Sequence, residues 1–270
     1  VVFAEANHVN MLKAAAEAAF LNSTSRTVVF EDDGKRYVAK RLAEKPRKLI
    51  QTLLMRWLVK RVTGQPLPMR TLALSEAAGS MDFEARRLQT LSAAGVRVPR
   101  VALVTPEFFV LEYCGTVVAT LLENWQQEEW RSELLRLARE LGEFHHAGHW
   151  HGGAQIKNIT LQDGLSYRID FEENFGEFLP LHAAQAADLV LFLNSISLAG
   201  PIVESEARQL MPKLLDAYFA AQPEPEIRRI IQRTLPLLKR LASIAGWFQR
   251  WSKKGIRRVL ILVDVLGGVK

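Results

Sequence analysis

The segment HGGAQIKNITLQDGLSYRIDFEEN, residues 151–174, decides the fold of this 270-residue chain. Asn158 follows a His-Gly pair after a few residues, a hairpin-like pattern comes next, and Asp170 lies inside an apolar, strand-like run. An amide oxygen and a carboxylate are hard oxygen ligands that suit Mg²⁺. The segment therefore predicts a loop and a hairpin that bring two magnesium ligands together.

The residues before this segment predict a sheet with one helix. Apolar runs at 28–30 and 37–39 flank an Asp-Gly pair at 33–34, which is a strong signal for a tight hairpin. The stretch 81–95 has apolar residues at helical spacing and ends on a glycine, a common helix stop. Two further strand-like runs lie within 96–115.

The residues after position 127 are mostly helical in pattern. The stretch 128–148 has four apolar residues on one helical face, namely Leu134, Leu137, Leu141 and Phe144. Strand-like runs follow at 159–161 and 167–171, and the helical pattern from Leu181 onward is interrupted near Pro201, Pro223–Pro225 and Pro236. The order predicts an α+β chain with two lobes. The predicted lobes are a β-rich one with one helix over 1–113, including a basic helical insertion at 45–75, and a mainly α-helical one over 114–270.

The composition and net charge of the chain indicate which classes of binding partner are favoured. With 49% hydrophobic residues the chain can bury a full core, and its net charge of +6 favours anionic partners such as nucleotides, nucleic acid or an anionic membrane. Two segments, 45–75 and 227–263, are basic and rich in apolar residues, and the second includes Trp247, Phe248 and Trp251. Such segments suit an interfacial helix on anionic lipid. The alternative, a solvated basic face whose apolar side packs on the protein, stays open.

Several functional classes are not favoured by the sequence. Cys114 is the only cysteine, which rules out an intrachain disulfide and fits a reducing cytoplasm. The first residues do not have the pattern of a signal peptide, and no apolar run reaches the ~18 residues of a membrane span. The histidines of HHAGHWH (145–151) lack the spaced partners of a zinc site, and the chain has no Walker A motif.

The parts needed for phosphoryl transfer occur in a workable order. This chemistry requires a cation on the nucleotide phosphates, magnesium ligands and a positioned acceptor. Lys40 lies in a predicted strand, and Glu84 lies in the following helix, where it could hold the lysine by an ion pair. Asn158 and Asp170 then supply the metal ligands.

Five segments taken together resemble a known family. They are YVAKRL (37–42), FEARRLQTLSAAGVRVP (83–99), FFVLEYCG (108–115), HGGAQIKNI (151–159) and RIDFEEN (168–174). Their order and spacing resemble the protein-kinase-like fold, and within it the bacterial lipopolysaccharide core kinases and related small kinases of the Bud32 and RIO type. The resemblance extends from about residue 26 to about residue 197.

The resemblance implies a role for each matching residue. It implies ATP and Mg²⁺ as cofactors, with Lys40 on the α and β phosphates, Glu84 orienting that lysine, and Asn158 and Asp170 binding the metal. The remaining implied residues are His151, which opens the catalytic loop, Asp188, which steadies it, and Glu112, Tyr113 and Cys114, whose backbone would hold adenine.

Two departures from the family pattern stand out. The region FLNSTSRTVVF (20–30) has no glycine where a Gly-rich loop is usual, so the hydroxyls of Ser23, Thr24 and Ser25 are expected to contact phosphate instead. The family's aspartate base is replaced by Gly153, and Gln155 stands where protein kinases carry a lysine. Gln155 could orient an acceptor hydroxyl, an anionic acceptor would need no base, and Glu172 or Glu173 could act as a substitute base.

These observations favour an ATP- and Mg²⁺-dependent kinase that works in the cytoplasm, at the inner membrane of a Gram-negative-type bacterium. The resemblance implies a lipid-linked sugar or lipopolysaccharide precursor as acceptor, and the basic segments would meet the anionic membrane surface. Two alternatives stay open: a pseudokinase that serves as a scaffold because of Gly153, and a small kinase that acts on protein or binds RNA.

Overall fold

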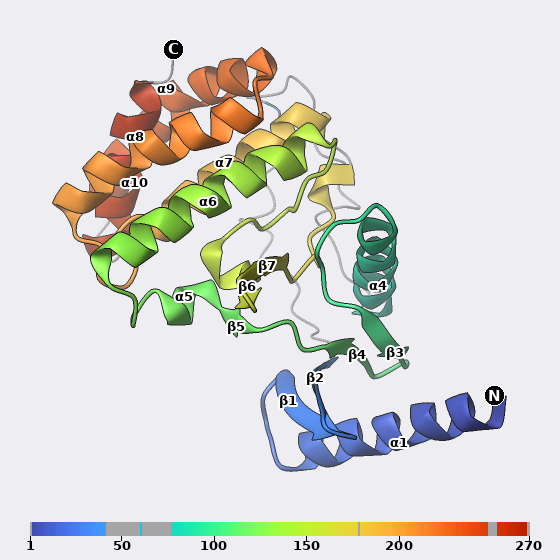
Figure 1. The fold of residues 1–270 in the computed structure, drawn as a ribbon. Coiled ribbons are helices and arrows are strands. Elements are labelled where there is room, and N and C mark those ends of the chain that lie inside the picture. The colour runs from blue at the N-terminus through green and yellow to red at the C-terminus, as the bar shows by residue number, and fades with distance from the viewer. Residues whose placement is uncertain (1, 42–59, 61–76, 178, 248–252, 269–270) are drawn as a thin grey trace.

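The computed structural model describes residues 2–41, 60, 77–177, 179–247 and 253–268. The first part of the chain forms a four-stranded antiparallel sheet in the order β1-β2-β4-β3 (Figure 1). Its strands are β1 (Thr27–Asp32), β2 (Lys35–Arg41), β3 (Val101–Val104) and β4 (Phe108–Glu112). The predicted Asp-Gly hairpin is confirmed, with Asp33 and Gly34 both at positive φ (49° and 69°), as the tight turn between β1 and β2 requires.

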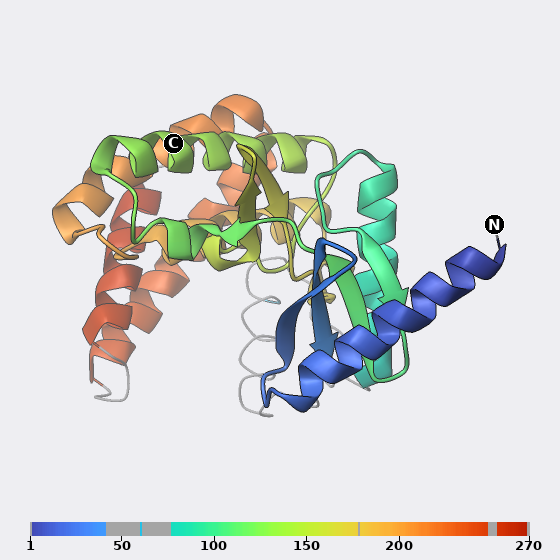
Figure 2. The same ribbon diagram turned by 60° about the horizontal axis from the view of Figure 1, so that its bottom comes forward.

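Two helices pack on this sheet, α1 (Val2–Leu21) and α4 (Ala77–Ala93). Leu12, Ala16 and Phe20, spaced by four residues, form the buried face of α1, which crosses one face of the sheet (Figure 2). Burial of a leucine or phenylalanine side chain contributes about 1.5–3 kcal/mol. The prediction of a single helix in this part of the chain missed α1, because its run of alanines leaves only a weak apolar stripe in the sequence.

A smaller antiparallel sheet, β5-β6-β7, begins the second part of the chain. Its strands are β5 (Thr116–Val117), β6 (Ile159–Gln162) and β7 (Leu165–Arg168). Two short helical segments adjoin it, α5 (Val118–Leu121) and the 3-10 turn η1 (Ile156–Asn158), and a second 3-10 turn, η2 (Phe175–Glu177), lies against the helix that follows it in the chain. This sheet therefore carries the segment on which the sequence prediction depended.

Long helices make up the rest of the chain (Figure 1). They are α6 (Gln127–His146), α7 (Leu181–Ile196), α8 (Glu204–Ala221), α9 (Pro225–Trp247) and α10 (Lys253–Gly267). The predicted apolar stripe of α6 is buried in the main hydrophobic core, where Leu134, Leu137 and Leu141 have no exposed surface. The predicted α+β fold with a sheet-rich first lobe and a helical second lobe is confirmed.

Two local predictions are wrong. We expected a break near Pro236, because a proline removes one backbone donor from a helix. Helix α9 nevertheless continues through Pro236, because its buried apolar residues pack in the main core and hold it in place. The strand expected to reach residue 171 ends at Arg168, because Asp170 has a φ of 67°, which a strand ladder cannot contain.

Some predictions fall on residues that the structure does not describe. The basic insertion at 45–75 lies outside the described residues except for Lys60, as do Phe248 and Trp251, and the side chain of Trp247 is also not described. The lobe boundary between residues 113 and 114 stays a prediction. Within the described ranges, no helix is both long enough and apolar enough to cross a bilayer.

Candidate active site

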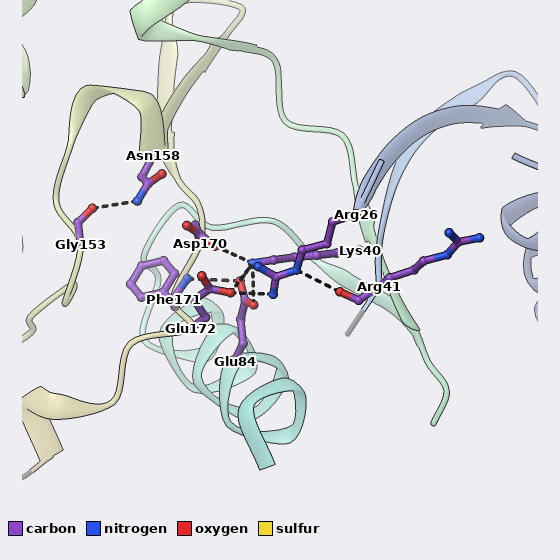
Figure 3. A network of polar contacts seen from close by, with 9 residues as sticks. All are labelled: Arg26, Lys40, Arg41, Glu84, Gly153, Asn158, Asp170, Phe171 and Glu172. Carbon is purple, nitrogen blue, oxygen red and sulfur yellow. Dashed lines mark hydrogen bonds and ion pairs between the residues drawn. The ribbon is translucent and has the colours of Figure 1, made fainter. Parts of the chain in front are cut away.

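Lys40 and Glu84 form a buried ion pair between the sheet and α4. The Lys40 ammonium on β2 lies 2.9 and 3.2 Å from the two carboxylate oxygens of Glu84 (Figure 3). Burial alone would lower the pKa of Lys40, but the carboxylates of Glu84, Asp170 and Glu172 raise it above its ordinary value. The lysine therefore keeps a fixed positive charge at the junction of the two lobes.

Asp170 completes this cluster from the second lobe. Its Oδ1 is 2.5 Å from the Lys40 ammonium. Burial alone would raise the pKa of Asp170, but the charge of Lys40 lowers it below its ordinary value, so the carboxylate is ionised. The next backbone N–H, that of Phe171, donates to Glu84 Oε1 at 3.2 Å, and the Phe171 ring stacks on His151 at 4.2 Å. One buried lysine thus links β2, α4 and the segment after β7.

The loop from His151 to Asn158 is held by buried hydrogen bonds. The Asp188 carboxylate on α7 accepts the backbone N–H groups of His151 at 2.5 Å and Gly152 at 2.9 Å. The N–H of Gly153 donates to His151 Nδ1 at 3.1 Å, and the Asn158 amide donates to the Gly153 carbonyl at 2.9 Å (Figure 3). These bonds fix the loop backbone on which Asn158 and Gly153 are carried.

The buried histidines make stability depend on pH. Burial lowers the pKa of His151 to about 4, and it also lowers that of His145. Both are neutral in the folded protein at pH 7, while in the unfolded chain they bind protons as the pH falls below about 6.5. We therefore expect full stability above pH 6.5 and a loss of about 2 kcal/mol from His151 alone by pH 5.

Urea unfolding at pH 7.5 and pH 5 measures this loss directly. A His151→Gln variant is the control, and its unfolding free energy should change less between the two values. Equal unfolding free energies of the parent protein at both pH values would contradict the expectation.

The residues around Asp170 fit a magnesium ion. The Asn158 nitrogen is bonded to the Gly153 carbonyl, which leaves its amide oxygen as the atom available to a cation. The ionised Asp170 carboxylate is the second hard oxygen ligand. Among the described residues, Glu84, Asp170 and Glu172 also have carboxylate oxygens within 4.8 Å of one another, but the Lys40 ammonium lies 2.9, 2.5 and 3.5 Å from them and already balances this group.

The predicted adenine-binding stretch follows β4. The N–H of Glu112 donates to the backbone carbonyl of Arg100 at 2.9 Å, and the N–H of Tyr113 donates to the backbone carbonyl of Arg36 at 3.0 Å. Of the three N–H groups at 112–114, that of Cys114 has no backbone carbonyl partner in the described part of the chain. The Cys114 carbonyl accepts from Thr160, and burial raises the pKa of its thiol. The amide of Cys114 is therefore the candidate backbone donor in the stretch for which adenine binding was predicted.

The predicted phosphate contacts of the turn before β1 stay predictions, and a further residue of this turn reaches the cluster. Ser23 Oγ accepts the Ser25 N–H at 3.1 Å, and Ser25 Oγ accepts the Thr27 N–H at 3.3 Å, so neither of these bonds uses the O–H donor of either serine. Thr24 is exposed. The residue that reaches the cluster from this turn is Arg26, whose Nη2 lies 2.7 Å from Glu172. Sequence reasoning missed Arg26, and the only available signal was a basic residue directly after the hydroxyl run.

The backbone at Gly153 does not require glycine. Its φ is not in the left-handed region, and a Cβ built there would meet Asn158 Nδ2 at 3.4 Å and His151 Nδ1 at 3.9 Å. These are ordinary van der Waals contacts. Gln155 is half-buried, and its N–H donates to the Gly153 carbonyl at 2.7 Å. The position can therefore hold the aspartate that the family pattern contains.

The two-lobed α+β fold and the Lys40–Glu84–Asp170 cluster agree with the protein-kinase-like fold that the sequence resembles. Over 111 residues the chain is 36% identical to the KEOPS complex subunit Bud32 of Pyrococcus abyssi (strain GE5 / Orsay). That match covers 40% of this chain and 50% of the relative, so the chain spans half the length of the curated protein it matches. No family model matches the chain.

Two solved structures align with most of the chain at low identity. WaaP in complex with acyl carrier protein aligns with 86% of this chain and 91% of its own, at 18% identity and a TM-score of 0.44. The choline kinase LicA from Streptococcus pneumoniae aligns with 96% of this chain and 99% of its own, at 12% identity and a TM-score of 0.40.

Proposed function

We propose that this protein is a phosphotransferase that uses ATP and Mg²⁺. The observation that carries the proposal is the single buried ammonium of Lys40, which bonds both to Glu84 on α4 and to Asp170 in the second lobe. Glu84 fixes the Lys40 ammonium, and the ionised Asp170 carboxylate lies beside it. The lysine can therefore contact a phosphate, and the aspartate can bind a metal ion in the adjacent position.

Each proposed role follows from the surroundings of the residue. Lys40 would hold the α and β phosphates, and Glu84 keeps the lysine in place from the buried side. Asn158 and Asp170 would hold Mg²⁺, which supplies charge neutralisation between the phosphates when it is bound. The amide of Cys114 would hold adenine, and Asp188 fixes the loop by accepting its backbone N–H groups.

Gly153 favours an acceptor that does not depend on a carboxylate base. The transition state of phosphoryl transfer is usually loose, so deprotonation of the acceptor is not demanded early. An acceptor that is already anionic needs no base, and a hydroxyl acceptor could be oriented by the half-buried Gln155 beside Gly153. Glu172 is less suited to the role of substitute base, because its carboxylate bonds to Arg26 and faces Lys40.

We further propose a lipid-linked sugar or lipopolysaccharide core intermediate as acceptor, phosphorylated at the cytoplasmic face of the inner membrane. This proposal is supported by the sequence resemblance to lipopolysaccharide core kinases and by the basic, apolar segments 45–75 and 227–263. Such segments would meet anionic lipid or an anionic acceptor.

Transfer of labelled phosphate from [γ-³²P]ATP tests the acceptor. With a bacterial lipid extract, Mg²⁺ and the full chain, we expect label in the lipid fraction, and an Asp170→Asn variant should remove it. Flotation with anionic vesicles tests the membrane site in the same preparation. Label in added protein but not in lipid would favour a kinase that acts on protein.

A pseudokinase that acts as a scaffold is the second candidate, and Gly153 is the observation that favours it. The relative named above is a subunit of a complex, which makes an assembly role a reasonable alternative for this chain. Nucleotide binding without transfer to lipid, sugar or protein would support the scaffold over the enzyme. Salt-dependent binding to RNA but not to vesicles would favour an RNA partner instead.

A further inference from the structure

Arg26 is fixed beside Lys40 although it lies in a different part of the sequence. Its Nε donates to the carbonyl of Arg41 at 3.1 Å, and the Arg41 N–H donates back to the Arg26 carbonyl at 2.8 Å. Arg41 directly follows Lys40 on β2. Both the backbone and the side chain of Arg26 are therefore held at the end of β2, next to the cluster (Figure 3).

Arg26 and Lys40 share one carboxylate oxygen. Glu172 Oε2 lies 2.7 Å from Arg26 Nη2 and 3.5 Å from the Lys40 ammonium. The side chains of Arg26 and Glu172 are 39% and 29% exposed, whereas that of Glu84, on the other side of Lys40, is 3% exposed. Two fixed cations, Arg26 and Lys40, thus flank one carboxylate oxygen on the solvent side of the cluster. This is the arrangement of an anion-binding site, and the Glu172 carboxylate is the anion that occupies it.

The turn before β1 gives a reason for a cation at this place. A Gly-rich loop holds phosphates with backbone N–H groups, but residues 20–30 contain no glycine, and the backbone N–H groups of Ser25 and Thr27 already donate to the hydroxyl oxygens of Ser23 and Ser25. A guanidinium is a planar fork of donors that matches two oxygens of a phosphate. Arg26 therefore has both the position and the chemistry to replace the missing loop.

We propose that Arg26 binds the polyphosphate of the nucleotide together with Lys40, and that Glu172 competes with the phosphates for Arg26. The inference rests on the proposed function, since it assigns a phosphate ligand and a competing carboxylate to the same site. Binding of the nucleotide exchanges the Glu172 carboxylate for phosphate oxygens. Arg26 is then a determinant of affinity for nucleotides that carry several phosphates, and adenosine binding does not depend on it.

Fluorescence titration with mant-ATP and Mg²⁺ tests the inference, with adenosine as the competitor that lacks phosphate. Arg26→Ala should raise the Kd for mant-ATP about tenfold or more, the size of a lost charge-assisted hydrogen bond at a partly exposed site. Glu172→Gln should lower that Kd, and most of this gain should vanish in the Arg26→Ala background. Lys13→Ala removes one exposed positive charge on α1 and is the matched control, which should bind as the parent does.

The outcomes separate the inference from the function it rests on. Absence of mant-ATP binding by the parent protein would overturn the proposed function. Tight binding by the parent with an unchanged Kd in Arg26→Ala would overturn the role of Arg26 alone. A full gain from Glu172→Gln in the Arg26→Ala background would overturn the competition. Because both side chains are partly exposed, the variants should fold, and an Arg26→Lys variant with intermediate affinity would support the need for the guanidinium fork.

Discussion

Replacing Gly153 with aspartate is expected to raise the rate of phosphate transfer to a neutral hydroxyl acceptor by about 100-fold. A positioned general base is worth about 10²–10⁴-fold, and the loose transition state of phosphoryl transfer favours the lower end of this range. The backbone at Gly153 accepts a side chain, and the new Cβ would lie in ordinary contact with Asn158. The aspartate would stand in the loop that Asp188 holds rigid. Initial rates of label transfer from [γ-³²P]ATP measure the effect.

Gly153→Asn is the matched control, since it adds the same volume without a base. It should leave the rate within a few-fold of the parent. With an acceptor that is already an anion, such as a phosphate monoester, the aspartate should give little gain or a loss through repulsion. Equal gains from aspartate and asparagine would show that the missing base does not limit the reaction.

Loss of Lys40 is expected to remove transfer altogether and to destabilise the fold. In Lys40→Met the Glu84 carboxylate, 3% exposed, stays buried without its cation, and Asp170 loses the same partner. Removal of one member of a buried ion pair costs about 3–5 kcal/mol. The rate of transfer should fall by at least about 10³-fold, because the phosphates lose the cation that positions them.

A double variant separates the two effects of this change. Lys40→Met with Glu84→Gln removes the uncompensated charge, so the unfolding free energy in urea should recover by about 2 kcal/mol or more. Transfer should not recover. A double variant that regains both stability and activity would mean that Lys40 is a structural residue and not a phosphate ligand.

Much of the candidate site could be predicted from local sequence patterns. Lys40, Glu84 and Asp170 lie up to 130 residues apart, yet each lies in a segment with a clear strand, helix or loop pattern, and the ion pair of Lys40 with Glu84 could be predicted. The direct contact of Lys40 with Asp170 was not predicted. Asp188 was placed by the resemblance of its helix to the family pattern, and the structure has it accept the backbone N–H groups of His151 and Gly152. The hairpin at Asp33-Gly34 was equally clear, since few residues tolerate two successive positive φ angles.

Other features could not be found in this way. The contact between Arg26 and Glu172 joins residues 146 apart, and neither carries a local pattern that points to the other. Helix α1 was missed because its many alanines leave no clear apolar stripe in the sequence to indicate the buried face. The positive φ of Asp170, which ends the strand early, could not be predicted from the apolar run around it.

We infer that Lys40, Asp170 and Asn158 form a site for a magnesium–nucleotide complex. The most direct test is the melting temperature of the parent protein and of Asp170→Asn, each with ATP and Mg²⁺, with ATP and EDTA, and with adenosine. At a ligand concentration of 100 times Kd, binding stabilises the folded state by about 2.7 kcal/mol, or roughly 5–10 °C for a chain of this size. We predict that shift for the parent with ATP and Mg²⁺, a much smaller one with EDTA, and no magnesium-dependent part in Asp170→Asn. An unchanged melting temperature of the parent with ATP and Mg²⁺, or a shift that is the same with and without the metal, would contradict the claim.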